Sequence, residues 1–103
     1  MNQIPALDQA VGIIRLTVSP DNTAAFVEGR TEVEKFTGSL MGHLSTELLH
    51  LGGDNWLMLI RWESKEAVRT AQKQTATAPV ISDWLNRTAK FVPFDTGFVR
   101  YVG

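Results

Sequence analysis

NWLMLIRWES, residues 55–64, is the stretch that decides the fold, because large apolar side chains alternate along it as in a β-strand with two different faces. Successive side chains of a strand point to opposite sides of its sheet. One side of this strand then carries Trp56, Met58, Ile60 and Trp62. The other carries Leu57, Leu59 and Arg61. Both faces are apolar enough to be covered, and two of the three Trp share one of them.

Start and stop signals on either side of this strand define the other elements. Ser19 and Ser64 are candidate helix caps, Gly38 is a helix stop, and Pro79 restarts a second helical segment. The pair Gly52-Gly53 with Asp54 forms a hairpin loop. We therefore expect strands at 11–18, 44–51, 55–62 and 98–102, and helices at 20–37, 65–75 and 79–90.

The order β-α-β-β-α-β is the split βαβ pattern of a ferredoxin-like α+β fold, an antiparallel sheet with its helices on one face. A chain of 103 residues is long enough for one such core. We expect a polar N-terminal arm at 1–10 and a single domain at 11–103.

The hairpin register predicts what covers the other face of the sheet. If Leu51 pairs with Asn55, odd-numbered residues of both strands share a face, with Leu49 opposite Leu57 and Glu47 opposite Leu59. Such an apolar face is larger than a monomer usually exposes, so we expect a twofold homodimer in which two sheets close on each other. The expected interface residues are Arg15, Glu47, Leu57, Leu59 and Arg61.

Composition excludes several classes of function. The net charge is −1, and neither a basic stripe nor an apolar run of roughly 18 residues is present, so we expect no nucleic-acid partner and no membrane span. The absence of cysteine excludes thiolate chemistry, and His43 and His50 are too few for a metal site of several histidines. We expect a cytoplasmic protein without a metal.

Aromatic residues are more numerous on the helix side than a small two-layer core requires. Two indoles of the third strand join Phe26, Phe36 and Trp84 there, and the interrupted second helix is a candidate lid. These side chains either pack as an ordinary core or line a cavity for a small apolar ligand.

The run WESKEAV, residues 62–68, gives the chain a resemblance to the antibiotic biosynthesis monooxygenase family, which often shows Trp-Glu-Ser at this point. The likeness spans roughly residues 11–102. It implies a dimeric ferredoxin-like α+β barrel. In the cofactor-free oxygenases of this family, the Trp of the motif lines the site, which corresponds to Trp62 here. Their Asn four residues earlier and Tyr six residues later correspond to Met58 and Val68, and an Arg of the later helix corresponds loosely to Arg87.

The haem-degrading branch of the same family uses an Asn, a Trp and a His ligand that correspond to Ile14, Ala71 and approximately Ile81. None of these side chains binds iron or donates a hydrogen bond, so haem degradation by that mechanism is not expected.

An oxygenase without a cofactor must bind an electron-rich substrate and stabilise the anion that reduces dioxygen. Trp62 is the candidate donor, and His50 is either the base or an exposed residue of the hairpin end. Tyr101 is either a phenolic donor or a packed strand residue. The substrate-binding candidates are Met58, Trp84, Val68, Ile14, Phe36 and Arg87.

The sequence thus favours a cofactor-independent monooxygenase that acts on a phenolic, quinol or polycyclic aromatic compound. The alternative is a non-catalytic dimer of the same fold that binds a small molecule or has a structural role.

Overall fold

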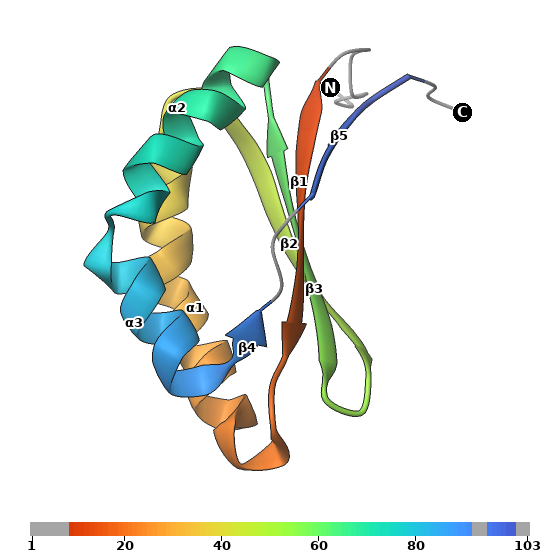
Figure 1. The fold of residues 1–103 in the computed structure, drawn as a ribbon, viewed down its shortest axis with the longest axis vertical. Coiled ribbons are helices and arrows are strands. Elements are labelled where there is room, and N and C mark those ends of the chain that lie inside the picture. Colours follow the sequence, from red (N-terminus) through yellow and green to blue (C-terminus); the bar gives the residue numbers. More distant parts are fainter. Residues whose placement is uncertain (1–8, 92–94, 101–103) are drawn as a thin grey trace.

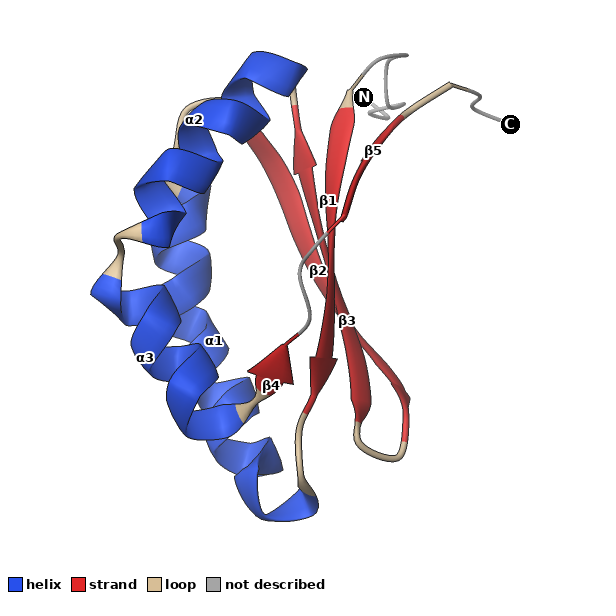
Figure 2. Ribbon diagram, viewed as in Figure 1, coloured by secondary structure: helices blue, strands red, loops and turns tan. Residues whose placement is uncertain are grey.

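A computed structural model describes residues 9–91 and 95–100, in which a single antiparallel sheet packs against a layer of helices (Figure 1). The strands are β1 (Ala10–Thr17), β2 (His43–Gly52), β3 (Asn55–Trp62), β4 (Lys90–Phe91) and β5 (Asp95–Phe98). The helices are η1 (Pro20–Asn22), α1 (Thr23–Gly38), α2 (Lys65–Ala76) and α3 (Pro79–Thr88). All three α-helices lie on one side of the sheet (Figure 2). The ferredoxin-like α+β fold expected from the sequence is confirmed.

The strand order is β2-β3-β1-β4, and every pairing is antiparallel. β5 also pairs with β1, at Ala10 to Ile13, while β4 pairs with its other end at Leu16 and Thr17. The two short strands therefore occupy the same edge of the sheet one after the other. This arrangement corrects the predicted last strand, which begins at Asp95 instead of residue 98. Residues 101–102 of the predicted strand, including Tyr101, lie outside the described residues.

The hairpin keeps most of the predicted register. Leu49 lies opposite Leu57 and Glu47 opposite Leu59, as expected, and the same register places Ser45 opposite Arg61. The pairing of Leu51 with Asn55 is wrong, because an irregularity after His50 places Gly52 opposite Asn55. The φ angles of Gly52 and Gly53 are 105° and 55°, values that a glycine adopts without steric cost and that close the turn.

The helix boundaries follow their capping signals with two corrections. The Ser64 hydroxyl caps α2 by accepting a 3.2 Å hydrogen bond from the Ala67 amide, and α3 restarts at Pro79 as predicted. Ser19 does not cap with its side chain, since the chain first forms the short η1 before α1. α3 ends at Thr88 because Lys90 and Phe91 turn to pair with β1.

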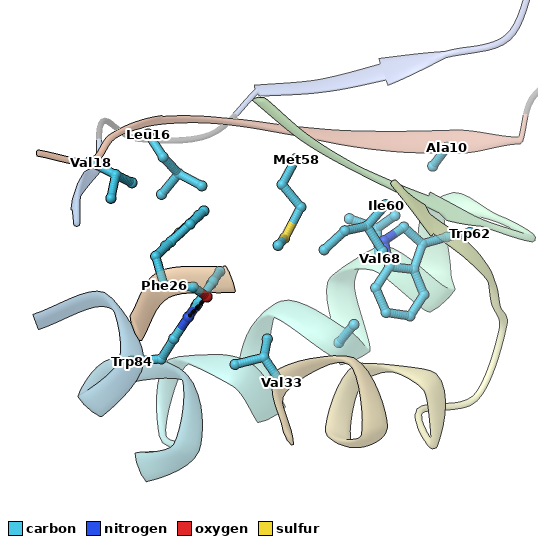
Figure 3. Packing of buried hydrophobic residues seen from close by; sticks show 11 residues of the cluster. Ala10, Leu16, Val18, Phe26, Val33, Met58, Ile60, Trp62, Val68 and Trp84 are labelled. Carbon is cyan, nitrogen blue, oxygen red and sulfur yellow. Dashed lines mark hydrogen bonds between the residues drawn. The ribbon is translucent and has the colours of Figure 1, made fainter. Parts of the chain in front are cut away.

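The core lies between the sheet and the helices, and the even-numbered side chains of β3 point into it, as the alternation predicted (Figure 3). Met58, Ile60 and Trp62 are 2%, 8% and 4% exposed, and Trp56 is half-buried. They meet Phe26 and Val33 of α1, Val68 of α2 and Trp84 of α3. No described helix is long and apolar enough to cross a membrane.

The outer face of the sheet carries the odd-numbered side chains. Leu57 and Leu59 are half-buried, and Leu49 and Leu51 are 37% and 58% exposed. Of the charged interface candidates on this face, Arg15 pairs with Asp95 of β5 at 2.9 Å, and no ion pair among the described residues joins Glu47 to Arg61. The Arg15–Asp95 pair is exposed to water, so it contributes little to stability, about 0–1 kcal/mol.

Candidate functional site

A cavity of about 400 Å³ lies between the sheet and the helices. β1 and β3 form one wall, α1 forms a second, and α2 and α3 close the third on both sides of the break before Pro79. The break interrupts the helix ladder, so α2 and α3 diverge from a single axis (Figure 1). The described lining residues are Gly12, Ile14, Leu16, Val33, Thr37, Met58, Ile60, Trp62, Val68, Gln72, Thr75, Ala76, Ile81, Ser82, Trp84, Leu85 and Asn86.

Five of the predicted site residues come together in this cavity. Ile14 of β1, Met58 and Trp62 of β3, Val68 of α2 and Trp84 of α3 all line it. Their positions result from the alternation on the strands and from the helical period, which turn these positions toward the space between the layers. Met58, Trp62, Val68 and Trp84 also belong to the buried core, so the same side chains pack against one another and line a cavity.

Three other predicted residues lie elsewhere. The ring of His50 is exposed at the hairpin end, where Nε2 lies 2.9 Å from the carbonyl oxygen of Gly53 and the ring stacks on Trp56 at 4.4 Å. Phe36 is half-buried on α1 without lining the cavity. Arg87 lines a separate, more polar depression of about 360 Å³. His50 therefore lies outside the cavity, in a position from which a base would not reach a ligand bound there.

The two tryptophans of the wall differ in their polar atoms. Trp84 Nε1 donates a 2.8 Å hydrogen bond to the carbonyl of Phe26, and its ring stacks on the Phe26 ring at 4.7 Å. Trp62 Nε1 makes no hydrogen bond to another described residue, and this atom is not completely enclosed by the protein. Buried indole N–H groups usually have a partner, so an unpaired one at a cavity wall is a donor available to a ligand.

The hydroxyl groups of the wall are engaged with their own helices. Thr37 Oγ1 donates to the Val33 carbonyl at 3.1 Å, and Thr75 Oγ1 donates to the Gln72 carbonyl at 3.2 Å. Ser82 Oγ does the same toward Pro79 at 3.3 Å. Such local bonds satisfy the hydroxyl protons without a ligand. The amides of Gln72 and Asn86 are the remaining polar side chains of the described wall.

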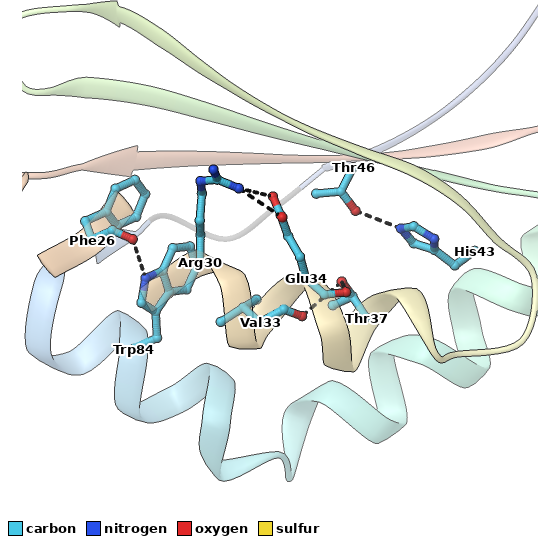
Figure 4. Close-up of polar contacts among 8 residues, drawn as sticks. All are labelled: Phe26, Arg30, Val33, Glu34, Thr37, His43, Thr46 and Trp84. Carbon is cyan, nitrogen blue, oxygen red and sulfur yellow. Dashed lines mark hydrogen bonds and ion pairs between the residues drawn. The ribbon is translucent and has the colours of Figure 1, made fainter. Parts of the chain in front are cut away.

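No described lining residue carries an acidic, basic or imidazole side chain. His43 is the histidine that contacts the wall, through an edge-to-face contact with the Trp62 ring at 5.4 Å. Its Nε2 lies 2.7 Å from Thr46 Oγ1, and burial lowers its pKa below 6.5 by penalising the charged form. Figure 4 shows this pair beside Arg30 and Glu34, whose 2.9 Å ion pair projects from α1 toward the sheet.

Sequence reasoning missed several lining residues. Gln72 and Thr75 lie four and seven positions after Val68, so the helical period could have placed them on the same face of α2. Ser82 and Asn86 lie four positions apart on α3, a separation that also places two side chains on one helix face. Gly12 carried no signal of its own, since a glycine adds nothing to a hydrophobic pattern.

Metal-binding groups are not evident in the described part of the chain. Within residues 9–91 and 95–100, no three or more His, Asp or Glu side chains gather in a way that could hold an ion.

Comparison with known proteins agrees with the fold and identifies the family. The family model of the antibiotic biosynthesis monooxygenases matches residues 10–78, and the chain belongs to this family. The structure is similar to that of SnoaB, a cofactor-independent oxygenase from Streptomyces nogalater, with 19% identity, a TM-score of 0.75 and coverage of 91% of this chain and 95% of the other. It is also similar to MupZ from Pseudomonas fluorescens, with 11% identity, a TM-score of 0.74 and coverage of 93% and 72%. No curated protein sequence matches significantly.

Proposed function

We propose that this protein is a cofactor-independent monooxygenase whose substrate is a phenolic, quinol or polycyclic aromatic compound. Membership of the monooxygenase family supports the reaction class. The observation that carries the substrate class is the cavity itself, an apolar space of about 400 Å³ with the indole N–H of Trp62, which has no partner among the described residues, at its wall. A mostly apolar wall with a few polar groups, the indole N–H of Trp62 and the amides of Gln72 and Asn86, suits a flat ring system that bears an oxygen.

The chemistry follows from what such a substrate supplies. A phenol or quinol that loses its proton becomes an anion rich enough in electrons to reduce dioxygen. One oxygen atom then enters the ring system and the other leaves as water, with both hydrogens of that water drawn from the substrate. The protein binds the ring, excludes bulk water and stabilises the negative oxygen by donation from Trp62 Nε1.

Dioxygen uptake with a panel of hydroquinones and naphthols tests this proposal. Replacement of Trp62 by Phe keeps the ring and removes the donor, and it should lower the rate about 10- to 100-fold. Trp56→Phe is the matched control, because Trp56 lies on the same strand and face but does not line the cavity. Equal rates for the wild type and Trp62→Phe would contradict the role of the donor.

The absence of a titratable side chain from the described wall favours one alternative, a dimer that binds an aromatic compound without turning it over. Saturable binding of the same naphthols without any dioxygen uptake would select that alternative.

We also propose that the partner of the outer sheet face is a second copy of this chain. Leu57 and Leu59 form the middle of that face, and Leu49 extends it toward the hairpin. On this face Arg15 and Asp95 form an ion pair within the same chain, while Glu47 and Arg61 have no ion pair among the described residues and carry opposite charges that a second copy can meet.

A further inference from the structure

Gly12 lies in the middle of β1, on the face turned to the cavity. It pairs with Ile60, and its neighbours on the same face are Ala10 and Ile14. Each of these neighbours presents a side chain to the interior, whereas Gly12 presents bare backbone. The cavity wall is therefore recessed at this position of the strand.

The recess adjoins the Trp62 donor. A Cβ added to Gly12 would lie 4.0 Å from Trp62 Nε1 and 3.7 Å from the Ile60 carbonyl oxygen. Trp62 pairs with Ala10, two positions before Gly12 on the same face of β1. The 4.0 Å distance shows that its indole extends from there toward Gly12. A ligand group that lies next to the Gly12 backbone is therefore within reach of a hydrogen bond from Trp62 Nε1.

The backbone does not require a glycine at this position. The φ angle of Gly12 is outside the left-handed region, and both distances for an added Cβ correspond to ordinary van der Waals contact. A glycine inside a strand weakens that strand, because it has no side chain to pack and more conformational freedom to lose. Since neither the backbone conformation nor strand stability explains the glycine, its one remaining local effect is to leave open space beside Trp62 Nε1.

We propose that Gly12 is a specificity-determining residue, which admits an oxygen-bearing ring edge to the indole N–H of Trp62. The inference rests on the proposed function and adds the orientation of the substrate: the acceptor oxygen lies deep, between β1 and Trp62, and the apolar part of the ring system extends toward α2 and α3. A methyl group at position 12 would occupy the place of that oxygen.

Equilibrium dialysis with 1-naphthol and naphthalene measures this selectivity without any need for turnover. The wild type should bind 1-naphthol about tenfold more tightly than naphthalene, as expected for one hydrogen bond in an apolar site. Gly12→Ala should reduce this ratio to about one while naphthalene affinity changes less than about threefold, because the methyl blocks the oxygen position and leaves most of the cavity open.

Two further variants separate the selectivity from general effects of the substitution. Gly97→Ala is the matched control, since Gly97 is also a strand glycine without a positive φ and has no atom within 4 Å of an added Cβ. It should keep the wild-type ratio. In the double variant Gly12→Ala with Trp62→Phe, the ratio of 1-naphthol to naphthalene affinity should be no lower than in Trp62→Phe alone. Both changes remove the same interaction, so the second has nothing further to remove.

The outcomes distinguish this inference from the proposed function. An unchanged ratio in a folded Gly12→Ala protein, confirmed by a thermal midpoint at or above that of the wild type, would overturn the inference. Loss of the ratio in Gly12→Ala with retention in Trp62→Phe would overturn it as well, since the donor would then be another group. A wild type that selects 1-naphthol but consumes no dioxygen with any panel substrate would refute the monooxygenase proposal and leave the role of Gly12 in place.

Discussion

The indole N–H of Trp84 donates a 2.8 Å hydrogen bond to the backbone carbonyl of Phe26, which ties the cavity wall on α3 to the first turn of α1. Both residues are buried, and their rings stack at 4.7 Å. The bond gives Trp84 a structural role that Trp62, whose N–H has no partner in the described part of the chain, does not share.

Replacement of Trp84 by Phe should therefore lower stability. The variant loses a buried hydrogen bond and part of a packed ring, which together cost about 1–3 kcal/mol of unfolding free energy. Urea denaturation measures the loss. Trp56→Phe is the comparison, because its ring is half-buried and its N–H has no described partner. A loss at Trp56 equal to that at Trp84 would show that the Phe26 bond contributes nothing.

Gly29 and Gly38 of α1 should respond in opposite ways to alanine. Gly38 is the last residue of α1, has no positive φ, and would place an added Cβ within 4 Å of no atom, so Gly38→Ala should be neutral or stabilising, because alanine has the higher helix propensity. At Gly29 the added Cβ would lie 2.6 Å from Cδ1 of Trp84, a clash with a buried and hydrogen-bonded ring. We expect Gly29→Ala to lower the thermal midpoint. A midpoint raised by both changes would mean that α1 and α3 are packed less closely than described.

His43 should make the folded state sensitive to acid. Burial lowers its pKa below 6.5, so between the two pKa values the unfolded chain binds more protons than the folded one. The free energy of unfolding therefore decreases as the pH falls below about 6.5, the pKa of the histidine in the unfolded chain. Above that pH the imidazole is neutral in both states, and His43 causes no pH dependence. In His43→Gln, urea midpoints measured from pH 8 to pH 5 should fall less steeply below 6.5 than in the wild type. Parallel curves over the whole range would contradict the prediction.

The outer sheet face should tolerate no charge if it binds a second copy. Leu59→Glu places a carboxylate in the middle of that face, and sedimentation equilibrium should show the mass of a single chain where the wild type shows two. Thr70→Glu adds the same charge to an exposed position of α2, and it should keep the wild-type mass. A dimer that survives Leu59→Glu at micromolar concentration would place the interface elsewhere.

The sequence predicted those features that depend on local period and capping. Met58 and Trp62 were assigned to the interior because a strand alternates with a period of two, and Ser64 and Pro79 marked helix starts because their chemistry suits those positions. For His50 the sequence left two alternatives, a base or an exposed residue of the hairpin end, and the structure agrees with the second. Its pairing with Trp56 follows the regular ladder, but strand alternation predicts only the face of a residue and not how far along the strand the cavity reaches. Gly12 was overlooked because its contribution is an absent side chain, which becomes visible only beside Trp62.

The pH dependence of turnover is a last test of the site, because the described wall holds no titratable side chain. If the substrate itself loses the proton in solution, kcat/KM should rise with pH up to the pKa of the substrate. Two naphthols that differ in acidity should then show inflections separated by the difference between their own pKa values. A base on the protein would instead give the same inflection for both, since the pH profile of kcat/KM also reports groups of the free enzyme. Trp62→Phe should lower both profiles without moving either inflection, because a neutral donor stabilises the anion and does not titrate. A common inflection would show that a side chain of this protein removes the proton.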